Sequence, residues 1–130
     1  MKSQNNFTIE ELFVDKPVQL KLFQYIERFI ESLGRVEIKV SKTQVAFKNK
    51  KQFAWVWLPM PSDKKRPPKS IVLSFSLGKP VDNPQIVQVV EPYPGRWMHH
   101  VIIQDNTDIN EEVKGWLKEA YDFGLGEANI

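Results

Sequence analysis

The sequence predicts a two-layer α+β domain with N-terminal helices, an antiparallel sheet of about five strands and a C-terminal helix. Three observations indicate this fold class. Apolar residues recur at helical spacing over residues 17–34, they alternate with polar residues in short segments between residues 36 and 103, and helical spacing returns after residue 106. This order of helices, meandering sheet and helix is typical of a helical layer packed on a sheet.

Two helices are expected before the first strand. Thr8 and Glu11 have the spacing of a capping box, which predicts a short helix. Pro17 suits the first turn of a second helix and Gly34 suits its C-terminal cap. The second helix has an apolar stripe of Leu22, Phe23, Ile26, Phe29, Ile30 and Leu33. We therefore expect a single domain over residues 1–130, in which residues 1–16 are a short extension with one helical segment.

Short strands are expected between the helices. Alternation over residues 36–40 predicts a half-buried strand, and the opposite alternation at Val45 and Phe47 requires a turn or bulge near Ser41–Lys42. Further strands are expected over residues 53–59, 70–77 and 97–103, whereas residues 85–90 fit either a strand or a helical turn. The last helix is expected to begin within residues 106–110, with Thr107 or Asp108 as its N-cap.

The strand over residues 53–59 leaves the placement of its two tryptophans open. If Phe47 and Phe53 pair across a three-residue turn, then Phe53, Trp55 and Trp57 join the core. If the loop is one residue shorter, the tryptophans face outward beside Lys48, as a basic–aromatic platform that can stack nucleic-acid bases. Aromatic residues on strands are usually core residues, so we expect the first arrangement.

Composition excludes several kinds of chemistry. The chain has no cysteine, which excludes disulfides, thiolate zinc sites, iron–sulfur clusters and cysteine nucleophiles. No apolar segment is long enough to cross a bilayer, and the amino terminus has no apolar signal core. We expect a cytoplasmic domain with no membrane partner and no cofactor.

The charge is unevenly distributed along the chain. Residues 35–69 carry ten Lys/Arg against two Asp/Glu, whereas residues 70–130 carry four against nine. A basic segment of this kind fits an anionic partner, although lysines that coat solvent-facing strand positions are the simpler explanation. The cations expected to face such a partner are Lys42, Lys48, Lys50, Lys51, Lys64, Lys65 and Arg66.

The segment EPYPGRWMHH, residues 91–100, predicts a structural corner that leads into a strand, with Trp97 buried as its anchor. Adjacent strand residues point to opposite faces, so His99 and His100 cannot both ligate one metal, and no metal site is expected. Arg96 can clamp a phosphate or carboxylate, or it can satisfy backbone carbonyls or pair with Glu91. The candidate ligand-binding residues are Arg96, His99, His100, Lys42 and Tyr93. We expect no catalytic residue.

Four segments resemble a known family: VEIKVSKTQVAF, FAWVWLP, VVEPYPGRWMHHVII and WLKEAYDFG. The family is bacterial and archaeal and is described as domain of unknown function 5655, and the resemblance runs from about Pro17 to Tyr121. It implies no established activity, cofactor or catalytic residue. Members occur alone or at the carboxyl end of larger proteins, some with a predicted nuclease domain, which by analogy favours a nucleic-acid-related accessory role.

Together these features favour a non-enzymatic binding or accessory module for an anionic ligand such as nucleic acid. One alternative is a small hydrolase or transferase that uses His99 or His100 with Arg96, in a cleft floored by Ser74 and Ser76. Another is a protein-interaction module, for example a homodimer that pairs through an exposed strand or an aromatic surface.

Overall fold

A computed structural model describes residues 7–59 and 69–126 of the chain. Its elements are α1 (Ile9–Leu12), α2 (Pro17–Leu33), β1 (Glu37–Val40), β2 (Gln44–Lys48), β3 (Gln52–Trp57), β4 (Ile71–Leu77), β5 (Ile86–Tyr93), β6 (Arg96–Ile103), the 3-10 turn η1 (Asn106–Asp108) and α3 (Glu111–Gly124). The strands form one antiparallel six-stranded sheet in the order β1-β2-β3-β4-β6-β5. The α+β prediction is confirmed, with one strand more than expected, because the ambiguous segment is strand β5.

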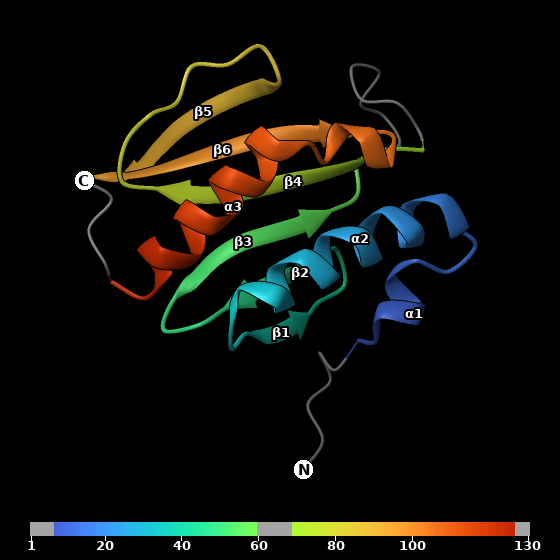
Figure 1. The fold of residues 1–130 in the computed structure, drawn as a ribbon. Coiled ribbons are helices and arrows are strands. Elements are labelled where there is room, and N and C mark those ends of the chain that lie inside the picture. Colours follow the sequence, from blue (N-terminus) through green and yellow to red (C-terminus); the bar gives the residue numbers. More distant parts are fainter. Residues whose placement is uncertain (1–6, 60–68, 127–130) are drawn as a thin grey trace.

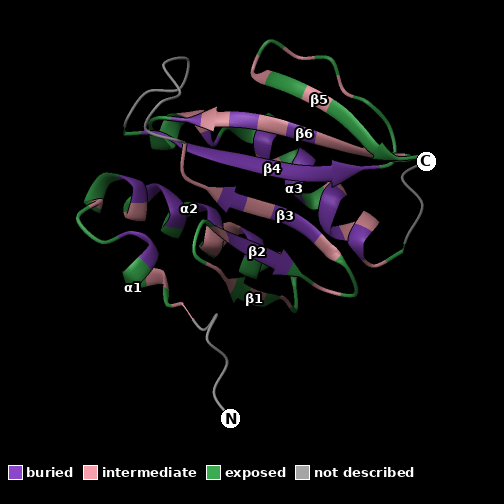
Figure 2. Ribbon diagram, turned by 180° about the vertical axis from the view of Figure 1, so that it is seen from behind, coloured by how far each residue is buried: buried purple, intermediate pink, exposed green. Residues whose placement is uncertain are grey.

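Both long helices lie on the same face of the sheet (Figure 1). α3 contacts β3, β4 and α2, and α2 also contacts β4. The view from behind in Figure 2 shows the opposite face, which no described helix covers. We call it the helix-free face. All seven residues of β4 are nevertheless buried. The position of β4 at the centre of the sheet therefore contributes more to this burial than the helices on one side.

The hydrophobic core lies between the helices and the sheet. Phe23 of α2, Phe47 of β2, Phe75 of β4 and Leu117 of α3 are fully buried. Each such side chain contributes roughly 1.5–3 kcal/mol when it leaves water. The apolar stripe expected on the second helix is the part of this core that α2 provides, so the periodicity identified the buried face of α2.

The predicted N-cap of the first helix is confirmed, and the predicted N-cap of the last helix is wrong. Thr8 Oγ1 accepts a hydrogen bond from the backbone N–H of Glu11 (3.1 Å), and Glu11 Oε1 accepts one from the backbone N–H of Thr8 (2.9 Å). Before α3, however, the chain forms the separate turn η1 and leaves helical geometry at Ile109 (φ −89°, ψ 68°). Asn110 therefore caps α3, by accepting from the backbone N–H of Val113 (3.0 Å).

A β-bulge between β2 and β3 decides where the tryptophans lie. Phe47 pairs with Ala54 and Lys48 with Gln52, so Phe53 is the extra residue. Phe53 and Ala54 are both fully buried. Beyond the bulge only every second residue faces the helices, and the expectation that Trp55 and Trp57 join the core is wrong: both are half-buried and lie on the helix-free face.

Candidate functional site

A shallow hollow of about 210 Å³ lies on the helix-free face. It is lined by Gln44, Trp55, Trp57, Ser74, Met98 and His100. Strand register explains why these residues meet, because Trp55 pairs with Ser74 and Ser74 pairs with His100. Met98 precedes His100 by two residues and so points to the same face. The hollow therefore spans four neighbouring strands.

Ser74 joins the two rings on either side of it. Trp57 Nε1 donates to Ser74 Oγ (2.8 Å), and Ser74 Oγ lies 2.6 Å from His100 Nδ1. The tautomer of His100 decides whether the Ser74 hydroxyl donates to Nδ1 or accepts from an Nδ1–H group. The Trp57 and His100 rings meet edge to face, with centroids 5.9 Å apart. These contacts fix the orientation of both rings.

Gln52 joins Trp55 to Arg96 in a similar way. Trp55 Nε1 donates to Gln52 Oε1 (3.3 Å), and Arg96 Nη2 donates to the backbone oxygen of Gln52 (2.7 Å). Arg96 Nε donates to Ser76 Oγ (3.4 Å). The guanidinium group is thus held above β3 and β4, and the expectation that it can satisfy a backbone carbonyl is confirmed.

Arg96 retains hydrogen-bonding capacity. A guanidinium group has five N–H donors, of which two are engaged here, so three remain. Ion pairs between described residues are Lys114–Glu111 (3.6 Å) and Lys118–Asp122 (3.4 Å), and neither includes Arg96. Arg96 is therefore a half-buried cation with no carboxylate partner in residues 7–59 and 69–126. An arginine in this state is suited to bind an oxyanion.

The corner before Arg96 has the structure expected for it. Tyr93 pairs with Arg96 across a two-residue loop in which Gly95 has a φ of 78°, a backbone conformation that favours glycine. Glu91 Oε2 accepts from the Gly95 N–H (2.9 Å). Tyr93 is 66% exposed and does not line the hollow. Trp97 is half-buried, so the expectation of a fully buried anchor is wrong.

His99 lies on the opposite face from His100, in the core. It is fully buried and stacks on Phe75, with ring centroids 5.1 Å apart and planes 4° apart. His99 Nε2 accepts from the backbone N–H of Val81 (3.0 Å), so its proton is on Nδ1. Burial lowers the pKa of His99, and the backbone carbonyls of Phe75 and Trp97 oppose this more weakly. We leave His99 out of the proposed site.

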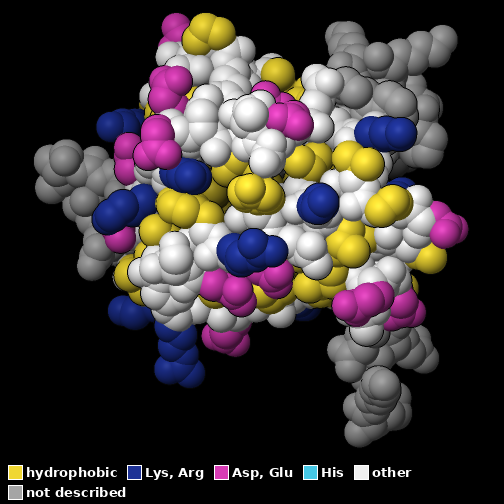
Figure 3. Space-filling view, turned by 45° about the vertical axis from the view of Figure 1, so that its right-hand side comes forward, with side chains coloured by type: hydrophobic (Ala, Val, Ile, Leu, Met, Phe, Trp, Pro, Cys, Tyr) yellow, Lys and Arg dark blue, Asp and Glu magenta, His cyan; other side chains and the backbone are white. Residues whose placement is uncertain are grey.

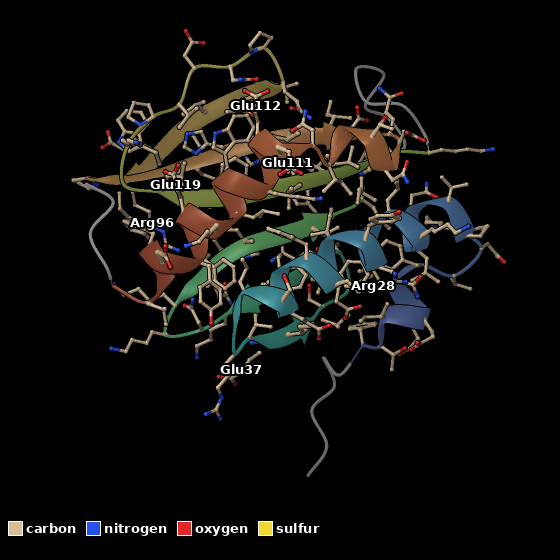
Figure 4. All side chains as sticks on the ribbon, in the orientation of Figure 1. Arg28, Glu37, Arg96, Glu111, Glu112 and Glu119 are labelled. Atoms are coloured by element: carbon tan, nitrogen blue, oxygen red, sulfur yellow. The ribbon has the colours of Figure 1, made fainter. Side chains whose placement is uncertain are left out.

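The predicted cations do not gather at one place. Lys42 lies in the exposed turn before Gln44, which pairs with Trp57, whereas Arg96 contacts Gln52 at the other end of β3. Figure 4 shows Arg96 at the start of β6, on the opposite side of the view from Arg28 of α2. Near that end, Lys48 and Lys50 line a second hollow of about 260 Å³ with Arg35, and Lys51 is exposed in the adjoining turn. Lys64, Lys65 and Arg66 lie outside the described residues.

Sequence reasoning missed Gln44, which lines the hollow, and Gln52, which contacts Trp55 beside it. Gln44 and Gln52 carry no distinguishing local signal, because glutamine is common on solvent-facing strand positions. Met98 could have been found from the alternation of β6, which places it with His100. The alternation of apolar and polar residues in β4 predicts that Ser74 and Ser76 point away from the core, and these two serines do lie on the helix-free face.

The family is shown by comparison with known proteins. The family model described as Domain of unknown function (DUF5655) matches residues 9–124, the whole range from α1 to α3. The chain belongs to the DUF5655 family. No curated protein and no solved structure matches it. The DUF5655 membership confirms the resemblance noted above, and it assigns no activity to the helix-free face.

Three further observations concern the described part of the DUF5655 chain. Within residues 7–59 and 69–126, no three His, Asp or Glu side chains are grouped as a metal site would require. No helix in this described part is long and apolar enough to span a bilayer. Ser74 is only 2% exposed and Ser76 is fully buried, so neither hydroxyl is presented openly to a substrate.

Proposed function

We propose that this DUF5655 domain is a binding module for anionic ligands that carry flat aromatic rings, namely nucleotides and single-stranded nucleic acid, and that it has no enzymatic activity. One observation carries the proposal: Trp55 and Trp57 lie on the helix-free face, at a hollow near the guanidinium of Arg96, which has no carboxylate partner among the described residues. Rings and phosphates occur together in nucleic acids, so a surface with indoles and an open arginine suits them.

The indole rings are prepared for stacking. The N–H groups of Trp55 and Trp57 are engaged by Gln52 and Ser74, which restrict the rings to one orientation before any ligand arrives. A ring that is already oriented loses less conformational entropy on binding. Stacking of a base on such a ring contributes about 1–3 kcal/mol.

Charge favours the same face. Arg96 offers three N–H donors there, and the backbone oxygen of Gln52 and the hydroxyl of Ser76 hold its guanidinium group in place. By contrast, on the side of the molecule shown in Figure 3, basic and acidic side chains are intermingled. Phosphate binding at Arg96 requires counterion release, so affinity should fall as salt rises.

A titration tests the proposal. A fluorescently labelled single-stranded oligonucleotide is titrated at low and at physiological salt, with fluorescence anisotropy as the readout. Trp55→Ala should weaken binding about tenfold or more, from the loss of one stacking contact. The matched control is Tyr25→Ala, an aromatic residue of α2 that is 46% exposed away from the hollow. Absence of binding to the wild-type domain at low salt would overturn the nucleic-acid proposal.

The hydrolase alternative has one observation in its favour, the 2.6 Å contact between Ser74 Oγ and His100 Nδ1. A serine nucleophile needs a general base of this kind. Ser74 is nearly inaccessible, however, and its oxygen already accepts the Trp57 N–H. A fluorophosphonate probe followed by mass spectrometry separates the two functions, since a reactive Ser74 would be labelled and a structural one would not.

The homodimer alternative is suggested by the exposed apolar side chains Val87, Val90 and Tyr93 on the edge strand β5. Two register shifts interrupt β5, and Pro92 has no N–H to donate to a further strand. We therefore expect a monomer. Light scattering after size exclusion, at several protein concentrations, measures the oligomeric state directly.

A further inference from the structure

The second hollow, of about 260 Å³, lies where the C-terminal end of α3 meets the start of β1 and the β2–β3 loop. Figure 1 shows these three parts of the chain close together. Arg35, Lys48 and Lys50 line the hollow, and none of its residues lines the hollow on the helix-free face. An inference about the second hollow therefore does not depend on the proposed function.

Hydrogen bonds between distant residues hold the walls of the second hollow together. Tyr121 Oη donates to the backbone oxygen of Arg35 (2.8 Å), and Asn49 Nδ2 donates to the backbone oxygen of Tyr121 (2.7 Å). Asn49 Oδ1 accepts from the backbone N–H of Lys50 (2.7 Å), which fixes the turn that carries this lysine. The hollow is thus formed before a ligand arrives, which lowers the entropic cost of binding.

The lining of the second hollow has an excess of positive charge. Arg35, Lys48 and Lys50 are exposed cations, and Glu37 is the one carboxylate among the described residues that line the hollow. Glu37 is opposite Lys48 in the register of β1 with β2. Within residues 7–59 and 69–126, however, none of these four side chains forms an ion pair or a hydrogen bond. Like charges around one hollow repel each other, so an anion between them is stabilising.

Charge and size together indicate which anion fits. Three cations against one carboxylate leave two positive charges in excess, and a phosphate monoester carries about −1.5 to −2 at pH 7. Sites for drug-sized molecules span about 300–1,000 Å³, so a hollow of about 260 Å³ suits a phosphate with a short carbon chain better than a whole nucleotide. Tyr121 and Leu125, which also line the hollow, carry carbon surface that such a chain can contact.

We propose that the second hollow binds a small phosphate monoester, whose dianionic phosphate is held by Arg35, Lys48 and Lys50. Arginine binds phosphate oxygens through paired N–H donors, and lysine acts as a point charge. Glu37 lies on the same lining and weakens binding by repulsion. A monoester is favoured over a diester, because a diester carries a single negative charge.

NMR titrations of the isotopically labelled domain, at constant ionic strength, test this proposal with glycerol 3-phosphate and with the diester dimethyl phosphate. The monoester should bind about fivefold or more tightly than the diester. Arg35→Gln and Lys50→Gln should each weaken monoester binding about three- to tenfold. The matched control is Lys39→Gln, an exposed lysine of β1 outside the lining. Glu37→Gln should tighten binding about two- to fivefold, a gain that unfolding cannot produce.

Three results would overturn the proposal: no binding of glycerol 3-phosphate at low ionic strength, equal affinities for the two phosphates, or equal weakening by Lys39→Gln and Lys50→Gln. Glycerol 3-phosphate has no ring to stack, so Trp55→Ala should leave its affinity unchanged, and failure here leaves the proposed function intact. Oligonucleotide affinity should in turn be unchanged in Arg35→Gln. If a 5′-phosphorylated oligonucleotide loses as much affinity in Arg35→Gln as glycerol 3-phosphate does, the phosphate belongs to a nucleic-acid end and the small-molecule assignment is wrong.

Discussion

Ser74 Oγ lies 2.6 Å from His100 Nδ1 across the pairing of β4 with β6, and it accepts the Trp57 N–H at 2.8 Å on its other side. One buried hydroxyl thus connects β3, β4 and β6. No part of this contact is local in sequence, because Trp57, Ser74 and His100 are separated by 17 and 26 residues. It determines which surfaces of the two rings face solvent.

Ser74→Ala should destabilise the domain by about 1–3 kcal/mol, since it removes the hydrogen-bond partner that Trp57 and His100 share in a nearly buried position. Urea unfolding followed by circular dichroism measures the change. Ser76→Ala is the matched control, because Ser76 Oγ makes only long contacts, to Arg96 Nε (3.4 Å) and Met98 Sδ (3.9 Å). A larger loss for Ser76→Ala than for Ser74→Ala would contradict this account.

Stability should fall below pH 6.5 because of His99. Its pKa is lowered in the folded state from an ordinary value of 6.5, so between the two pKa values the unfolded chain binds more protons than the folded one. The contribution of His99 is therefore complete above pH 6.5 and is lost as the pH falls through the folded-state pKa. Urea unfolding at several pH values between 7.5 and 5 measures this dependence.

The matched variants for this pH effect are His99→Gln and His100→Gln. The glutamine oxygen can accept the Val81 N–H in place of His99 Nε2, and it does not titrate in this range. The pH dependence should flatten in His99→Gln and persist in His100→Gln. The reverse result would assign the titration to the helix-free face.

Two glycines of α3 should respond in opposite ways to alanine. A Cβ at Gly124 would lie 2.5 Å from Asn49 Oδ1 and 3.0 Å from Phe53 Cβ, whereas a Cβ at Gly115 meets nothing within 4 Å. Gly124→Ala should therefore lower the melting temperature, because the β2–β3 loop must move away from the helix. Gly115→Ala should raise stability by up to about 1 kcal/mol through helix propensity. Thermal melts of both variants provide the measurement.

Arg96→Ala and Trp97→Ala should both reduce stability moderately. Arg96 loses its bond to the Gln52 oxygen, about 0.5–1.5 kcal/mol, and Trp97 loses only partial burial of its ring. Only Arg96→Ala should also weaken oligonucleotide binding. Thermal melts and anisotropy titrations on the same preparations distinguish the two roles. Complete unfolding of either variant would show that the contribution of that residue to stability is larger than stated here.

Local signals were sufficient for much of the fold. The capping box at Thr8, the start of α2 at Pro17 and the strand β4 each depend on residues only a few positions apart, and the structure has all three. The prediction of the α3 N-cap was wrong for a reason that is also local. The Asp105 carboxylate accepts from the backbone N–H of Thr107, and the Asp105 backbone N–H donates to Asp108 Oδ2. These bonds form the separate turn η1, so the helix begins later.

The candidate site depended on pairing between distant residues. A single extra residue, Phe53, turns Trp55 and Trp57 from the core to the helix-free face, because side chains alternate along a strand and a one-residue slip reverses them all. Likewise, β4 pairs with β6 and not with β5, and only this order brings Ser74 against His100. Composition and periodicity describe each strand alone, whereas register and strand order follow from the packing of the whole sheet against α2 and α3.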